Sequence, residues 1–170
     1  MLRKALLTSI IIASSSTVSL AATPYVGGSL GVTDLGIYSG GKVQSGAIGK
    51  FFGGYGSTFG VNKNIYLGGE LNIDLAHYPH YSGATYGVGA SFIPGIMITK
   101  DTMVYGRIGV EASRYFHSST THLGNQLGLG LRTNVAKNWD IRGEYVHLSN
   151  AIGNMSGNSQ LNLGLAYKFD

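Results

Sequence analysis

The chain has 170 residues, including 27 Gly, 11 Tyr and no Cys, and only 12% of its residues are charged. This composition is typical of closely spaced β-strands and excludes a fold held together by disulfides. Arg3 and Lys4 lie in the first 21 positions, which leaves 10 basic residues against 8 acidic ones in the rest of the chain. That balance offers no basic patch, so nucleic acid is not an expected partner.

The N-terminal segment reads MLRKALLTSIIIASSSTVSLAA. Its two basic residues precede an apolar run that is too short to span a bilayer, and the segment ends in small residues. This order is typical of a secretory signal peptide. We therefore expect residues 1–21 to be a signal peptide and residues 22–170 to form a single domain, and no later segment is apolar for long enough to predict a transmembrane helix.

After the signal peptide, apolar and polar residues alternate with the period of two that predicts β-strands. The pattern predicts eight strands, near residues 24–33, 46–59, 64–76, 84–98, 103–115, 122–134, 139–149 and 159–169. Three of the connections are short, whereas those at 34–45, 77–83, 116–121 and 150–158 are longer. Such asymmetry is typical of outer-membrane barrels, which have short periplasmic turns and longer extracellular loops.

A repeat of 37 residues runs through the predicted strands. It is marked by a lysine in each short turn, by a glycine six residues later, and by a charged residue directly after the glycine. The lysines are Lys63, Lys100 and Lys137, the glycines Gly69, Gly106 and Gly143, and the charged residues Glu70, Arg107 and Glu144. One strand-loop-strand-turn unit is therefore repeated at constant length.

The alternation also predicts which face of the strands meets lipid. One face is apolar, whereas the other carries five cations and five carboxylates. The predicted inward charges are Lys50, Glu70, Asp74, Arg107, Glu111, Arg132, Asp140, Arg142, Glu144 and Lys168. An Arg or Lys at the bilayer midplane on the lipid side costs about 2–4 kcal/mol, whereas balanced charges inside a barrel can pair.

These features predict an all-β fold: an eight-stranded antiparallel up-and-down transmembrane β-barrel whose lumen is filled by side chains. The alternative is a soluble barrel of the lipocalin type, with the apolar face turned inward around a ligand. Aromatic residues near the strand ends favour the membrane barrel, since they fit the girdles at the two bilayer interfaces. These residues are Tyr115, Phe116, Trp139, Tyr145, Tyr167 and Phe169.

The stretches NIYLGGELNIDL, MVYGRIGVEASRY, LGLGLRTNVAKNWDIRGEYVHLS and QLNLGLAYKF resemble the opacity-protein and OmpA-like family of eight-stranded outer-membrane barrels. The resemblance runs from about residue 24 to the end of the chain. It implies an integral outer-membrane protein of a Gram-negative bacterium, of a kind often tied to envelope integrity or surface contact. We expect the protein to be non-enzymatic and to need no cofactor. The partners that the resemblance implies are outer-membrane lipid and lipopolysaccharide, and host-surface or envelope proteins bound through the extracellular loops.

Two further patterns suggest ligand sites. The stretch GIYSGGKV at 36–43 has phosphate-loop spacing but places Val43 where such a loop needs Ser or Thr, so we do not expect phosphate binding. All five histidines fall near the predicted long-loop rim, where imidazoles can hold a metal. The weak candidates for a metal site are His77, His80, His117 and His122. Exposed loops also tolerate histidine, and we favour that interpretation, with no metal bound.

The stretch HLSN at 147–150 is similar to the His-x-Ser-Asn motif of the lipid A 3-O-deacylases, which are also eight-stranded barrels. The resemblance implies His147 as the base, Ser149 as the nucleophile and Asn150 as an oxyanion helper. That family orients its histidine with an acidic residue on the next strand, where this chain has Gln160 near the matching place. Because a missing carboxylate weakens such a catalyst by orders of magnitude, no catalytic residue is favoured and deacylation is the alternative function.

Overall fold

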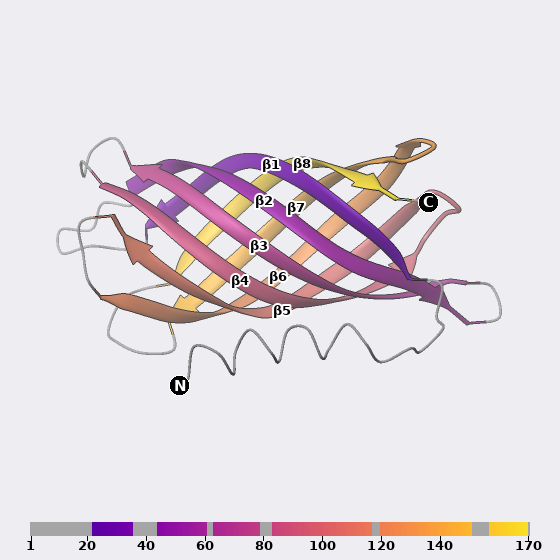
Figure 1. Ribbon diagram of the computed structural model, residues 1–170, viewed down its shortest axis with the longest axis horizontal. Coiled ribbons are helices and arrows are strands. Elements are labelled where there is room, and N and C mark those ends of the chain that lie inside the picture. The colour runs from indigo at the N-terminus through magenta and orange to yellow at the C-terminus, as the bar shows by residue number, and fades with distance from the viewer. Residues whose placement is uncertain are drawn as a thin grey trace.

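Eight antiparallel strands close into a barrel in the computed structural model, which describes residues 22–35, 44–60, 63–78, 83–116, 120–150 and 157–169 (Figure 1). Each strand pairs with the next along the chain, and β1 pairs with β8 to close the sheet. The strands are β1 (Thr23–Leu35), β2 (Gln44–Phe59), β3 (Ile65–Tyr78), β4 (Gly83–Met97), β5 (Thr102–Tyr115), β6 (Thr121–Ala136), β7 (Trp139–Asn150) and β8 (Asn158–Lys168). The expected signal peptide, residues 1–21, lies outside the described residues.

The predicted fold class is confirmed, and each predicted strand lies within three residues of the observed bounds. We call the end of the barrel with the connections near 60–64, 98–101 and 137–138 the turn end, and the opposite end the loop end. Both ends of the described chain lie at the turn end, where the Phe169 amide donates to the Pro24 carbonyl at 2.9 Å. At the first turn, Gly60 and Lys63 have positive φ angles of 90° and 51°.

The two faces of the barrel wall differ sharply in polarity. Along β3 every second side chain is buried in the lumen, and the intervening ones are exposed. The outer face presents large apolar side chains such as Leu30, Leu129 and Leu163, which are 75%, 68% and 67% exposed. This arrangement is the reverse of a soluble barrel, so the lipocalin-type alternative is wrong. Among the described residues, no helix is long and apolar enough to cross a membrane.

Aromatic side chains gather near both ends of the outer wall. At the turn end, Tyr167 packs edge-on against Trp139 and Phe169, with ring centroids 5.2 and 5.1 Å apart. Near the loop end, Phe116 packs against Tyr86 at 5.4 Å. Tyr115 does not join this girdle, contrary to expectation. It follows the inward parity of β5, because neighbouring side chains point to opposite faces of a strand, and its ring packs against that of His122.

Candidate functional site

The charged residues of the 37-residue repeat meet at the centre of the lumen. Arg107 forms ion pairs with both Glu70 and Glu144, and its Nε lies 2.8 Å from Glu144 Oε1. Arg142 pairs with the same two carboxylates, at 2.7 Å from Glu70 and 2.8 Å from Glu144. We call these four residues the middle tier. All are buried, and Arg107 is completely inaccessible to solvent.

The barrel geometry explains why residues 37 positions apart converge. The repeat carries the chain through two strands, so Glu70, Arg107 and Glu144 occupy equivalent inward positions on β3, β5 and β7. Two aromatic side chains, Tyr25 and Phe52, contact the middle tier. Tyr25 donates a hydrogen bond of 3.1 Å to Glu70, and the Phe52 ring lies 3.9 Å from Cζ of Arg142. Two cations and two carboxylates therefore neutralise one another where water is excluded.

A second group of charges lies on the loop side of the middle tier. Lys50 and Asp74 form an ion pair of 3.1 Å between β2 and β3, and Glu111 accepts a hydrogen bond from the Gln126 amide. We call Lys50, Asp74 and Glu111 the outer tier. Ser91 links the two tiers. Its hydroxyl accepts a hydrogen bond from Arg107 of the middle tier and donates one to Gln126, which in turn donates to Glu111 of the outer tier. The outer tier holds two carboxylates and one cation, a formal charge of −1.

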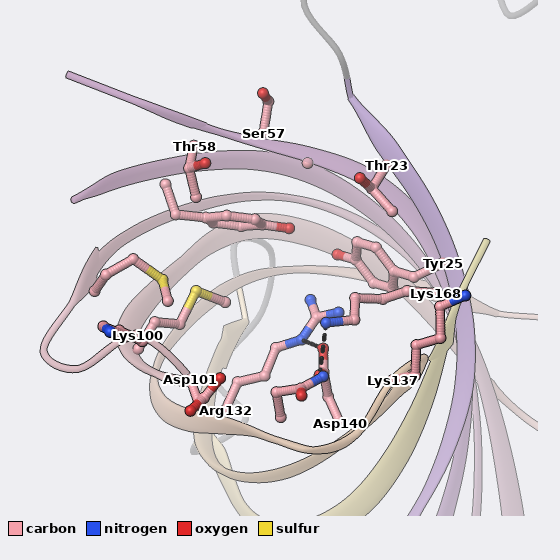
Figure 2. A pocket seen from close by; sticks show the side chains of 15 residues that line it. Thr23, Tyr25, Ser57, Thr58, Lys100, Asp101, Arg132, Lys137, Asp140 and Lys168 are labelled. Carbon is pink, nitrogen blue, oxygen red and sulfur yellow. Dashed lines mark hydrogen bonds and ion pairs between the residues drawn. The ribbon is translucent and has the colours of Figure 1, made fainter. Parts of the chain in front are cut away.

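The third group lies toward the turn end and reverses that imbalance. Asp140 accepts from Arg132 Nε at 2.6 Å and pairs with Lys168 at 3.0 Å (Figure 2). Arg132 also stacks over the Tyr25 ring, with Cζ 4.5 Å from its centroid. We call Arg132, Asp140 and Lys168 the turn tier. Its formal charge is +1, so the ten charges balance over the whole lumen but are polarised along the barrel axis.

The structure thus places all ten predicted charges inside the barrel. Nine are buried, and Lys168 is partly exposed at the turn end. The predicted lumen network consisted of charged residues alone, whereas neutral polar residues with the same inward parity share the lumen. Those with at most 4% exposure are Thr33, Asn72, Gln126, Gln160 and Asn162.

The predicted His147–Ser149 site lies on the outer wall near the loop end. His147 is exposed and Ser149 is half-buried, and both have the outward parity of β7. The Nδ1 atom of His147 lies 3.2 Å from Oγ of Ser159, the residue directly opposite it on β8. Tyr145 donates to the same hydroxyl at 2.9 Å. The side chain of Asn150 lies outside the described residues.

The prediction from sequence that Gln160 lies beside this site is wrong. Gln160 pairs with Val146 and is buried in the lumen, because its parity on β8 is opposite to that of Ser159. The residue in contact with the histidine is Ser159. Its backbone amide donates to Asp34 of β1 at 2.6 Å, so this carboxylate binds Ser159 and not His147. A neutral hydroxyl can orient the imidazole but cannot balance the charge of an imidazolium.

The candidate metal residues do not converge where the structure describes them. His77 is exposed on the outer face of β3, whereas His122 has the inward parity of β6. His80, His117 and the stretch 36–43 lie outside the described residues. Within the described part of the chain, no group of three or more His, Cys, Asp or Glu residues is placed to hold a metal ion.

A model of the outer membrane protein β-barrel domain matches residues 5–169, whereas no curated protein matches the sequence. The structure of Neisserial surface protein A is similar over 88% of this chain and 99% of that one, with 20% identity and a TM-score of 0.64. The attachment invasion locus protein Ail of Yersinia pestis has 16% identity and a TM-score of 0.54, with coverage of 87% and 97%.

The outer membrane enzyme PagL is also similar, with 14% identity and a TM-score of 0.57, over 84% of this chain and 98% of that one. At these identities the structures show a shared fold. The family match covers nearly the whole sequence, and it agrees with the closed barrel and its apolar outer wall. This protein therefore belongs to the family of the outer membrane protein β-barrel domain and resides in the outer membrane.

Proposed function

We propose that this protein is a non-enzymatic barrel of the outer membrane whose extracellular loops bind glycans, either of lipopolysaccharide or of a host surface. The observation that carries this proposal is the filled lumen. Arg107 bonds at once to Glu70, Ser91 and Glu144 at full burial, so bonded side chains occupy the barrel where a pore would need open space. We therefore assign ligand binding to the connections at the ends of the barrel and not to the lumen.

The composition of the long connections favours neutral polar ligands. The segments 36–43, 79–82, 117–119 and 151–156 read GIYSGGKV, PHYS, HSS and AIGNMS, and Lys42 is their only Asp, Glu, Lys or Arg residue. Tyrosine, serine and asparagine combine a flat apolar surface with hydrogen-bonding groups and are enriched in binding loops. Glycans present the same combination of apolar faces and hydroxyls. One structure of the similar protein Ail contains the heparin analogue sucrose octasulfate, which is a saccharide but, unlike the neutral ligands favoured here, carries many negative charges.

The test is binding of cells that display the protein to immobilised lipopolysaccharide and to host-surface glycans. We expect Tyr38→Ala together with Tyr81→Ala to reduce binding, because each substitution removes an aromatic surface from a loop. Lys63→Gln, in a turn at the other end, is the matched control and should bind as the parent does. Equal binding by the loop variant, with the same amount of folded protein on the cells, would refute the proposal.

A second candidate function is hydrolysis of an acyl ester of lipid A. The specific observation in its favour is the contact of 3.2 Å between Nδ1 of His147 and Oγ of Ser159. In the tautomer in which Nδ1 donates to this hydroxyl oxygen, Nε2 carries no proton and is available as a base. In this reaction Ser149 Oγ would attack the ester carbonyl and pass its proton to His147, which would return it to the departing sugar oxygen. Water would then release the fatty acid from Ser149. The outward position of both residues suits a lipid substrate.

Mass spectrometry of lipid A from cells with and without the protein separates the two functions. We expect identical lipid A, because Ser159 supplies no negative charge to His147. Loss of one acyl chain that depends on Ser149 would establish the hydrolase instead. In that case Ser149→Ala should restore the acyl chain, whereas Ser45→Ala, at another outward serine of the loop end, should not.

A further inference from the structure

A cavity of about 370 Å³ lies inside the turn end of the barrel (Figure 2). Residues from the ends of all eight strands line it, so it is built by closure of the barrel and not by one segment. We call this cavity the vestibule. Short turns in an outer-membrane barrel face the periplasm, so the vestibule opens on the side opposite to the extracellular loops.

One wall of the vestibule is the turn tier. Both oxygens of Asp140 already have partners, because one accepts from Arg132 and the other from Lys168 and the Asn134 amide. The two cations therefore share a single negative charge. Arg132 is 92% buried; its Nε donates to Asp140, and its guanidinium also forms a hydrogen bond with the hydroxyl of Tyr66. Desolvated cations that exceed their anions attract a further anion.

The excess of positive charge continues to the opening. Lys100 and Lys137 line the vestibule together with the turn tier, and Asp101 is the only other carboxylate in the lining. The lining therefore has four cations and two carboxylates, a formal charge of +2. In Figure 2, Lys100 and Lys137 lie on opposite sides of the cavity, with Arg132 and Asp140 between them. Cations thus outnumber carboxylates among the residues that line the vestibule.

The opposite wall is apolar. Tyr66 and Met103 are buried in a cluster with Ile93 and Tyr105, and Met97 packs against that cluster. Flexible thioether side chains adapt to apolar groups of different shape. A molecule that fills the vestibule is therefore expected to carry an anionic group for one wall and a short aliphatic group for the other.

We propose that the vestibule binds the C-terminal carboxylate of a peptide, or of a small N-acyl amino acid, with the terminal aliphatic side chain against the two methionines. Its volume equals that of about twelve water molecules, which suits one or two residues. Arginine provides a planar pair of donors that matches a carboxylate, and Lys168 adds a second charge beside it. This site is independent of ligand recognition by the loops.

The test uses the full-length mature barrel in detergent micelles, labelled at the methionine methyl groups and observed by NMR. N-acetyl-L-leucine is the probe, and its neutral amide and inorganic phosphate are the comparisons. We expect the Met97 and Met103 signals to shift saturably with N-acetyl-L-leucine and to shift little with the amide or with phosphate. Met97→Leu and Met103→Leu variants assign the two signals.

Charge variants locate the carboxylate. Lys168→Gln should weaken binding about tenfold, because it removes one charge-assisted bond. Lys63→Gln, outside the lining, is the matched control and should bind as the parent does. Should Lys168→Gln not fold, as judged by heat-dependent gel migration, Lys100→Gln replaces it and should weaken binding to a smaller degree. Equal shifts with the amide, equal affinity in all variants, or no saturable shift would each overturn the proposal.

Discussion

Arg107 provides the most direct test of the charge-paired lumen. Its side chain is completely buried and donates to Glu144 and Ser91 at 2.8 and 2.9 Å, besides its ion pair with Glu70. Substitution Arg107→Met keeps a long side chain of comparable length but leaves two buried carboxylates with Arg142 alone. Removal of one partner from a buried ion pair costs about 3–5 kcal/mol, and we expect the free energy of unfolding to fall by that amount.

A second substitution separates lost charge from lost packing. In the double variant Arg107→Met with Glu144→Gln, one cation and one carboxylate remain, so the middle tier is neutral again. We expect the double variant to recover about 2 kcal/mol of the loss, whereas Glu144→Gln alone should destabilise the barrel by leaving two cations with one carboxylate.

The measurement is urea unfolding in phospholipid vesicles, followed by the fluorescence of Trp139. This residue is the only tryptophan and lies half exposed on the outer wall, so its emission changes when the strand leaves the membrane. The slope of free energy against urea should be the same for all variants, since each unfolds the same surface. A loss below about 1 kcal/mol for Arg107→Met, or no recovery in the double variant, would refute the reasoning.

Three further predictions concern other parts of the wall and lumen and use the same assay. Glu111→Gln should raise the free energy of unfolding by about 1 kcal/mol, because the outer tier holds one carboxylate too many; a loss of stability would show that this charge is needed. Leu163→Arg, at mid-strand on the lipid face, should lower the free energy of unfolding by about 2–4 kcal/mol. Val135→Arg, at the turn end of the same face, should lower it by about 1 kcal/mol or less. Equal effects would contradict the assigned membrane depth. Gly69→Ala should leave the stability unchanged, because nothing lies within 4 Å of the added carbon. Gly130→Ala should cost about 1–3 kcal/mol, because its added carbon would overlap the buried ring of Tyr105. The reverse order of the two effects would contradict the register.

The eight strands were predictable because each strand residue of a membrane barrel faces one of two environments. Lipid outside and polar side chains inside impose a period of two, which is strict along β3, and Glu70, Arg107 and Glu144 could be assigned inward from it. The prediction fails at a strand end, where two aromatic residues follow one another and the alternation of polar and apolar residues no longer shows which side chain points outward. The sequence predicts Tyr115, at the end of β5, among the girdle aromatics, yet its side chain points inward. Neighbouring side chains of a strand point to opposite faces, and Phe116 takes the outward position.

The serine and histidine on the outer wall show a different limit. His147 could be placed on the lipid side from its parity alone, but its neighbour could not, because the pairing of β7 with β8 depends on the length and path of the connection at 151–157. One residue of register exchanges the two faces of a strand. The observed register brings Ser159 to the histidine and turns Gln160 into the lumen.

The sequence by itself determined the number of strands, the two faces of the wall and the equality of positive and negative charges inside, because these follow from composition and from a local period. Only the tertiary structure decided which charges pair. Barrel closure brings residues that are 37 and 72 positions apart within 3 Å, and strand tilt sets their height along the axis. The division into tiers of opposite charge, and with it the positive vestibule at the turn end, exists only in that closed arrangement.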